Sequence, residues 1–200
     1  MFKFDIQQML LILPGIFIGL TFHEYAHGWV ADRLGDKTAR AQGRLTLNPL
    51  AHIDPVGFIA LLLVHFGWAK PVPVNPYNFR NVELRQGMLL VALAGPVTNL
   101  ILAFTIALLL HLGLFNFMAE IYLMATMAVY INVLLAVFNM LPIPPLDGSK
   151  ILAGLFPGKA NWIYQLENYG IIILLILVFT GVIGAILRFV VMPITGLLLP

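Results

Sequence analysis

Two histidines and a glutamate lie within five residues near the N-terminus, in the run His23-Glu24-Tyr25-Ala26-His27. This run matches the pattern H-E-x-x-H. On an α-helix, residues four apart are separated by about 40° of rotation and about 6 Å of rise, so both imidazoles can reach one metal ion. Glu24 is rotated by about 100° from His23, so it can accept a proton from a water beside the metal without being a ligand. The pattern is typical of zinc-assisted hydrolysis.

The cost of these side chains favours a functional interpretation. Three ionisable groups lie in one otherwise apolar stretch, and such groups are expensive in lipid and are normally kept for a function. A structural alternative has the histidines hydrogen-bonding across helices while Glu24 pairs with a lysine or arginine.

The composition defines the class of protein. The 200 residues are 60% hydrophobic and 10% charged and include no cysteine, whereas soluble domains carry about 25% charged residues. Such an apolar chain needs a lipid bilayer around it. Without cysteine, a metal must be held by His, Asp or Glu. The net charge of +2 and the lack of a long basic run exclude nucleic acid as a partner.

The apolar stretches predict an all-α integral membrane protein, a single domain over 1–200 with five to six hydrophobic segments. The stretches are 6–33, 56–67, 87–112, 119–141 and 170–199. Since a spanning helix needs about 20 residues, 56–67 is predicted to be a short re-entrant or interfacial helix. We expect the last stretch to span with 170–187 and to break around Gly184 and Arg188.

Two segments are predicted to be non-helical and to lie beside the active site. Residues 35–54 suggest a small β-hairpin or loop, and Lys70-Pro-Val-Pro-Val-Asn-Pro76 favours an extended strand that cannot pair fully. Non-helical backbone at membrane depth must be buried in protein or line a cavity. Within the first segment, His52 either faces such a cavity and modulates the site or caps the hairpin.

The basic residues predict the orientation, because cytoplasmic loops are enriched in Lys and Arg. If the first helix runs outside to inside and 56–67 does not cross, nine basic residues fall inside and only Lys3 and Arg188 fall outside. The nine are Arg33, Lys37, Arg40, Arg44, Lys70, Arg80, Arg85, Lys150 and Lys159. The metal site then lies towards the cytoplasmic side, and the compact chain favours a prokaryotic cell membrane.

A catalytic zinc needs a third protein ligand and one open position. Asp147 is the candidate, in Asn139-Met-Leu-Pro-Ile-Pro-Pro-Leu-Asp-Gly148, where the prolines stop a spanning helix. From spacing alone, Asp147 is equally well an N-cap for a helix that starts near Ser149.

Several motifs together resemble one family. H-E-Y-A-H in an apolar helix, Asn139-x-x-Pro-x-Pro-Pro-Leu-Asp-Gly148, Gly95-Pro-Val-Thr-Asn99 and the run from Arg44 to Pro55 resemble the site-2 protease family of intramembrane zinc metalloproteases, in its minimal branch without a PDZ domain. The resemblance covers about residues 20–155. It implies that His23, His27 and Asp147 hold one zinc ion per chain, that Glu24 is the catalytic acid/base, and that the substrate is a transmembrane protein.

Asn99 and Asn139 have two interpretations. A side-chain amide in a spanning helix is costly unless paired, and each is either a donor to the oxyanion or substrate, as the resemblance suggests, or a bond between helices. A helical substrate must be opened locally, and the strand that contains Val72 and Val74 can pair with it by strand addition. The rival functions are a non-proteolytic membrane metal-binding or transport protein and a structural scaffold. The oligomeric state and the substrate's identity are not determined by the sequence.

Overall fold

A computed structural model describes residues 6–64, 67–156 and 166–200, and these residues are mostly helical. The helices are α1 (Ile6–Arg33), α2 (Thr38–Ala41), α3 (Pro55–Val64), α4 (Leu84–His111), α5 (Ala119–Asn139), α6 (Asp147–Leu155), α8 (Gly170–Phe179) and α9 (Val182–Leu198). Two 3-10 turns, η1 (Pro49–Ala51) and η2 (Pro76–Asn78), lie in the connections.

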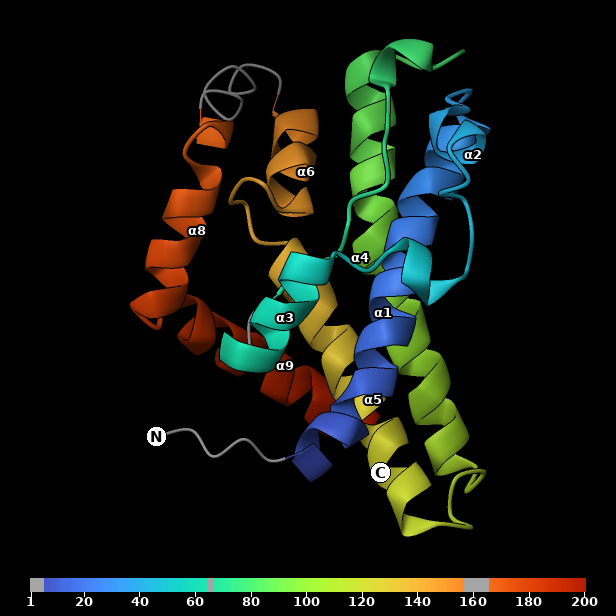
Figure 1. The fold of residues 1–200 in the computed structure, drawn as a ribbon, viewed down its shortest axis with the longest axis vertical. Coiled ribbons are helices and arrows are strands. Elements are labelled where there is room, and N and C mark those ends of the chain that lie inside the picture. The colour runs from blue at the N-terminus through green and yellow to red at the C-terminus, as the bar shows by residue number, and fades with distance from the viewer. Residues whose placement is uncertain (1–5, 65–66, 157–165) are drawn as a thin grey trace.

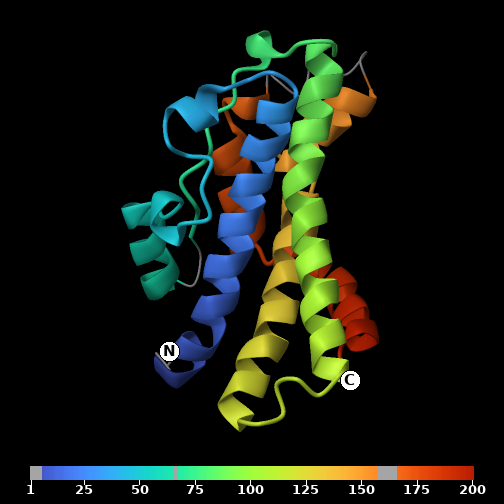
Figure 2. The same ribbon diagram turned by 90° about the vertical axis from the view of Figure 1, so that its right-hand side faces the viewer.

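Three helices, α1, α4 and α5, are long and apolar enough to cross a membrane. Their lengths of 28, 28 and 21 residues correspond to about 42, 42 and 32 Å at 1.5 Å per residue, against a hydrocarbon layer of about 30 Å. They run side by side along the long axis of the molecule (Figures 1 and 2). Small residues allow this close packing: a Cβ on Gly15 of α1 would lie 2.8 Å from the Cα of Ala128 on α5.

The predicted helix limits hold in part. The stretch 56–67 corresponds to α3, whose ten residues are too short to cross. The break predicted around Gly184 and Arg188 comes earlier, because α8 ends at Phe179 and α9 begins at Val182, with a bend of 76° between them. The break lies at Gly181, whose φ of +79° is a left-handed conformation that glycine adopts without strain. Among the described residues, three helices are long and apolar enough to cross a membrane, or up to four if the bent pair forms one span, and not the five to six segments predicted.

Of the two structures predicted for 35–54, a small β-hairpin or a loop, the hairpin is not found, and most of the segment is a loop. Residues 38–41 form α2 instead, because the carboxylate of Asp36 accepts hydrogen bonds from the backbone and hydroxyl of Thr38. Among the described residues, the only β contact is a single antiparallel bridge between Ile53 and Ala69. The segment 70–75 is extended but belongs to no sheet, since its prolines have no N–H to donate.

One end of the molecule gathers several elements that carry basic residues. The C-terminal end of α1, the N-terminal end of α4, α2 and α6 all lie at the same end in Figure 1. These elements carry Arg33, Arg85, Arg40 and Lys150. Lys3 and Lys159, which the orientation also counted, lie outside the described residues.

Candidate metal centre

Three buried side chains from two distant parts of the chain meet at one point. His23 and His27 lie one turn apart on α1, and Asp147 is the first residue of α6. Asp147 Oδ2 lies 3.1 Å from His23 Nε2 and 3.2 Å from His27 Nε2. One atom of each residue lies within 4.8 Å of the other two, and all three residues are at most 9% exposed. The group has the spacing and the donor types to hold a metal ion.

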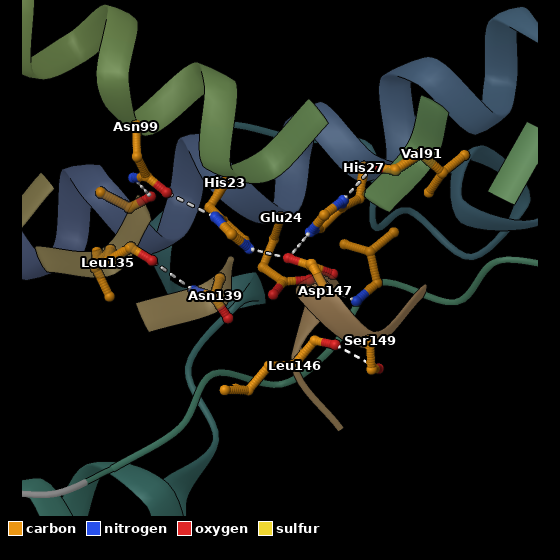
Figure 3. Close-up of polar contacts among 12 residues, drawn as sticks. His23, Glu24, His27, Val91, Asn99, Leu135, Asn139, Leu146, Asp147 and Ser149 are labelled. Atoms are coloured by element: carbon orange, nitrogen blue, oxygen red, sulfur yellow. Dashed lines mark hydrogen bonds and ion pairs between the residues drawn. The ribbon is translucent and has the colours of Figure 1, made fainter. Parts of the chain in front are cut away.

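The far side of each imidazole has its own acceptor. His23 Nδ1 donates to Asn99 Oδ1 over 2.6 Å, and His27 Nδ1 donates to the Val91 carbonyl over 2.7 Å. Figure 3 shows these contacts as a chain from Asn99 through His23, Asp147 and His27 to Val91. Such outer hydrogen bonds select the tautomer and orientation of a metal-ligating histidine.

The direction of these hydrogen bonds explains why the site fits a cation. With the proton on Nδ1, each neutral imidazole directs the lone pair of Nε2 towards Asp147. Two nitrogen lone pairs and a carboxylate oxygen then face one another in a buried space, an arrangement that is unfavourable without positive charge between them. Two His and one Asp with a fourth position open are a typical ligand set for catalytic zinc.

Helix α4 approaches both histidines closely because it has a glycine at the contact. A Cβ on Gly95 would lie 2.6 Å from Nε2 of His23 and 2.6 Å from Nε2 of His27. The next residue, Pro96, has no N–H and interrupts the hydrogen-bond ladder of α4. The sequence analysis used Gly95 only as part of a motif that resembles the family and missed its contact with the Nε2 atoms of both histidines.

Asn99, the hydrogen-bond partner of His23, is itself held by a second asparagine, Asn132. The amide nitrogen of Asn99 donates to the Gly19 carbonyl over 3.0 Å and to Asn132 Oδ1 over 2.9 Å, so both of its hydrogens are used. Asn132, on α5, donates in turn to the Ala128 carbonyl over 2.8 Å, and neither asparagine is exposed. In this arrangement Asn99 orients His23 and has no donor left for an oxyanion. Asn132 was missed, although a buried amide in an apolar helix gave the same signal as Asn99.

The start of α6 directs Asp147 into the site. The carboxylate does not cap the helix, because the N-cap is Leu146 and no side chain bonds there. A Cβ on Gly148 would collide with the carbonyl oxygens of Met140 and Leu141. Glycine at this position therefore lets α6 begin directly against the end of α5, which brings Asp147 to the histidines on α1.

Glu24 lies beside the three-residue group without belonging to it. Its Oε2 accepts a hydrogen bond of 2.8 Å from the backbone N–H of Val72, in the extended segment 70–75. The segment is fixed on both sides of this contact: Lys70 N–H donates to the His52 carbonyl over 2.9 Å, and Asn75 N–H donates to Asp36 over 2.7 Å. The extended segment that was predicted as a strand thus contacts the candidate base, Glu24, through the N–H of Val72.

The other predicted residues lie as follows. Asn139 is at the end of α5, and its amide nitrogen donates to Leu135 of the same helix over 3.0 Å (Figure 3). Val74 is partly buried in the extended segment, two residues after Val72. His52 is 2% exposed, and its Nε2 donates to the Thr46 carbonyl over 2.8 Å.

The fold and the site together define a class. The described part of the chain has three helices of membrane-spanning length, and two of them, α1 and α4, meet at a buried group of two histidines and an aspartate with a glutamate beside it. This is the arrangement of a helical membrane protein with the residues of a metal-dependent hydrolase.

The comparisons with known proteins agree with this class. Residues 116–183 match the profile of "Peptidase family M50". A Bacillus subtilis (strain 168) protein, "Putative zinc metalloprotease YwhC", is 40% identical over 88% of this chain and 84% of its own length. A Methanocaldococcus jannaschii protein, "Putative zinc metalloprotease MJ0611", is 34% identical over 75% of this chain and 73% of its own length. No solved structure matches.

The chain therefore belongs to peptidase family M50, the site-2 protease family, whose relatives here are named as zinc metalloproteases.

Proposed function

We propose that this protein is an intramembrane zinc metalloprotease that hydrolyses peptide bonds within or near transmembrane segments of membrane proteins. The observation that carries the proposal is the group formed by His23, His27 and Asp147, with Glu24 beside it. His23 lies ten residues, or about 15 Å, before the end of α1 at Arg33, and this supports a site at membrane depth.

His23, His27 and Asp147 would hold one zinc ion per chain. A bound zinc supplies Lewis acidity, which polarises a carbonyl group and makes a water molecule acidic near neutral pH. Asn99 and the Val91 carbonyl keep both imidazoles in the orientation that this role requires.

Glu24 is the proposed general base and acid. It would accept a proton from the water that attacks the scissile carbonyl, and would later give a proton to the leaving amine as the C–N bond breaks. The N–H of Val72 holds the carboxylate by a charge-assisted hydrogen bond and limits its rotation. Asn139 remains the candidate donor to the oxyanion, because only one acceptor of its amide hydrogens, the Leu135 carbonyl, is found among the described residues.

The extended segment is the proposed site of strand addition by an unwound substrate. Between residues 70 and 76 the prolines have no N–H, and the amides of Lys70, Val72 and Asn75 already have acceptors. Among the described residues, the amide of Val74 has no acceptor and can donate to a substrate carbonyl. We expect Val74→Pro to abolish cleavage with zinc content unchanged and Val74→Ala to remain active; equal cleavage by both variants would contradict strand addition.

We further propose that residues 1–200 act as one domain in a prokaryotic cell membrane, with the site towards the cytoplasm. The gathering of basic residues at the end of the molecule that carries α2 and α6 supports this orientation.

Zinc content and cleavage test the proposed function separately. Elemental analysis of the detergent-purified protein should find about one zinc per chain, and Asp147→Ala should lose it. Glu24→Gln should keep the zinc and lose at least about a thousandfold in cleavage rate. The control is Glu83→Gln, a change at an exposed residue outside the site, which should cleave normally. A metal-binding or transport protein would instead tolerate Glu24→Gln, and a scaffold would hold no stoichiometric zinc.

A further inference from the structure

A cavity of about 430 Å³ lies beside α1. It is lined by residues of α1, α3, α5, α8 and α9 and by parts of the loops around His52 and Ala69. We refer to it as the α1–α3 cavity. Its lining is apolar apart from Thr21, His52 and Asp54. Its volume lies within the usual range of small-ligand sites, about 300–1,000 Å³.

Two separate elements lead from the α1–α3 cavity to Glu24. On α1, the lining residues Phe17, Leu20 and Thr21 precede Glu24 by seven, four and three positions, so they share one face of the helix with it. On the extended segment, Ala69 lines the cavity, and Val72 bonds to Glu24 three residues later. Both α1 and the extended segment therefore run from the lining of the cavity to the candidate base, Glu24.

The distance is short. Four helical residues from Leu20 to Glu24 rise about 6 Å, and three extended residues from Ala69 to Val72 cover about 10 Å. An extended peptide advances about 3.3 Å per residue. A peptide bond beside Glu24 would thus place a residue two to three positions away in the α1–α3 cavity.

Among the polar residues of the lining, His52 carries a buried nitrogen without a hydrogen-bond partner among the described residues. The Thr46 carbonyl accepts from Nε2, so Nε2 carries the proton and Nδ1 is an acceptor in the neutral ring. Nδ1 is buried and has no hydrogen-bond partner among the described residues. A buried acceptor without a partner is costly, so the group that fills the cavity should be apolar and carry an N–H or O–H donor.

We propose that the α1–α3 cavity is a specificity subsite for a large apolar side chain of the substrate, two to three residues from the scissile bond, and that His52 Nδ1 accepts a backbone N–H of the same unwound stretch. This proposal rests on the proposed function. An unwound apolar peptide has both the apolar surface and the free N–H, whereas a lipid acyl chain has no donor.

Filling the cavity tests the subsite. Gly184 lines it, and a Cβ there meets no atom within 4 Å, so Gly184→Leu should narrow the cavity without a clash. Gly196→Leu is the matched control, since Gly196 also lies on α9 with open space around it but does not line the cavity. The probe is a set of synthetic transmembrane Leu/Ala peptides with a central Gly-Ser, each carrying one Phe or one Ala at successive positions, with cleavage read by mass spectrometry.

Wild type and Gly196→Leu should prefer Phe at one position two to three residues from the cut. Gly184→Leu should lose about tenfold or more in kcat/KM for that Phe peptide and little for the Ala peptide. Equal Phe preference in both variants would overturn the subsite while leaving the proposed function intact. Absence of cleavage by the zinc-loaded wild type with every peptide would overturn both.

Two substitutions of His52 separate substrate binding from loop structure. Asn places a polar atom near the position of Nδ1, and Gln places one near Nε2. If Nδ1 binds substrate, His52→Gln should raise KM about five- to tenfold with kcat unchanged, and His52→Asn should stay closer to wild type. If His52 only holds the Thr46 carbonyl, the order reverses, and that result would overturn the role of Nδ1. A lipid in the cavity would leave KM unchanged in both variants and would also overturn it.

Discussion

Two faces of α1 serve different purposes. On one face, His23 and His27 have partners on both sides of each ring, and α4 packs so closely that only glycine fits at residue 95. On the face that carries Glu24, the helix borders a cavity of about 430 Å³. On the first face the Nδ1 atoms of both histidines are hydrogen-bonded and α4 packs tightly, whereas beside Glu24 the second face borders an apolar cavity. One helix thus separates the residues that would hold a metal from those that would hold a substrate.

This difference decides what a substitution should change. Polar side chains in a dry site keep one geometry because each lost hydrogen bond leaves a buried group without a partner. In an apolar cavity, a substitution that changes the shape is tolerated, and its effect is to change which ligand the cavity accepts. Substitutions on the histidine face should therefore alter zinc binding, and substitutions on the cavity face should alter substrate choice.

The largest effect should come from removing a ligand. His27→Ala should abolish zinc binding, because two remaining ligands hold zinc much more weakly than three. Phe17→Ala, on the cavity side of the same helix, should keep about one zinc per chain. Elemental analysis of both variants checks the contrast, and loss of zinc from Phe17→Ala would show that the two faces are not independent.

Crowding the histidine face should have the next largest effect. A methyl group on Gly95 would lie 2.6 Å from both metal-facing nitrogens, so we expect Gly95→Ala to weaken zinc affinity by at least about a hundredfold. Gly15→Ala is the control: its Cβ crowds Ala128, which is connected to the histidines only through Asn132 and Asn99, so it should lower stability and weaken zinc affinity by no more than a few-fold. Competition with a chelator measures the affinity. Similar affinities in the two variants would contradict the close approach of α4.

The asparagines should have graded effects. Asn99→Leu removes the acceptor of His23 Nδ1, and partners of this kind contribute about 10- to 100-fold in metal affinity. Asn132→Leu acts only through Asn99, so we expect a loss of a few-fold. The same chelator competition orders the two variants. A larger effect at Asn132 than at Asn99 would mean that the network does not act through His23.

The smallest effect should come from the loop that holds the extended segment. Although burial opposes it, hydrogen bonds from Thr38, Asn78 and Asn75 hold the pKa of Asp36 below its ordinary value of 3.8. A carboxyl with a lowered pKa in the folded state adds stability above its unfolded pKa and loses it as the pH falls through the folded pKa. Asp36→Asn should therefore cost about 1–3 kcal/mol at pH 7.

Thermal unfolding in detergent at pH 7 and below pH 3.8 checks this prediction. The difference between wild type and Asp36→Asn should shrink at the lower pH. A difference that does not depend on pH would mean that the charge of Asp36 is not what holds Asn75 and the extended segment.

Local patterns in the sequence predicted the features that depend on near neighbours. The H-E-x-x-H spacing placed both histidines on one helical face, and the long apolar stretches predicted α1, α4 and α5. Where local signals competed, the predictions failed in part: the side chain of Asp36 supports the short helix α2 in a segment expected to be a hairpin or loop, and Gly181 ends a helix that was expected to continue to about Gly184.

The rest was decided by packing between residues far apart in the chain. The contact of His23 with Asn99 joins residues 76 positions apart, and its contact with Asp147 joins residues 124 apart. Spacing alone left Asp147 equally well a helix cap, and nothing local distinguished Gly95 from any other glycine in an apolar helix. The sequence by itself determined the ligand types and the helix that carries two of them, because helical geometry is local. Only the tertiary structure decided the third contact, the tautomers and the cavity, because these depend on how helices that are far apart in the chain pack against one another.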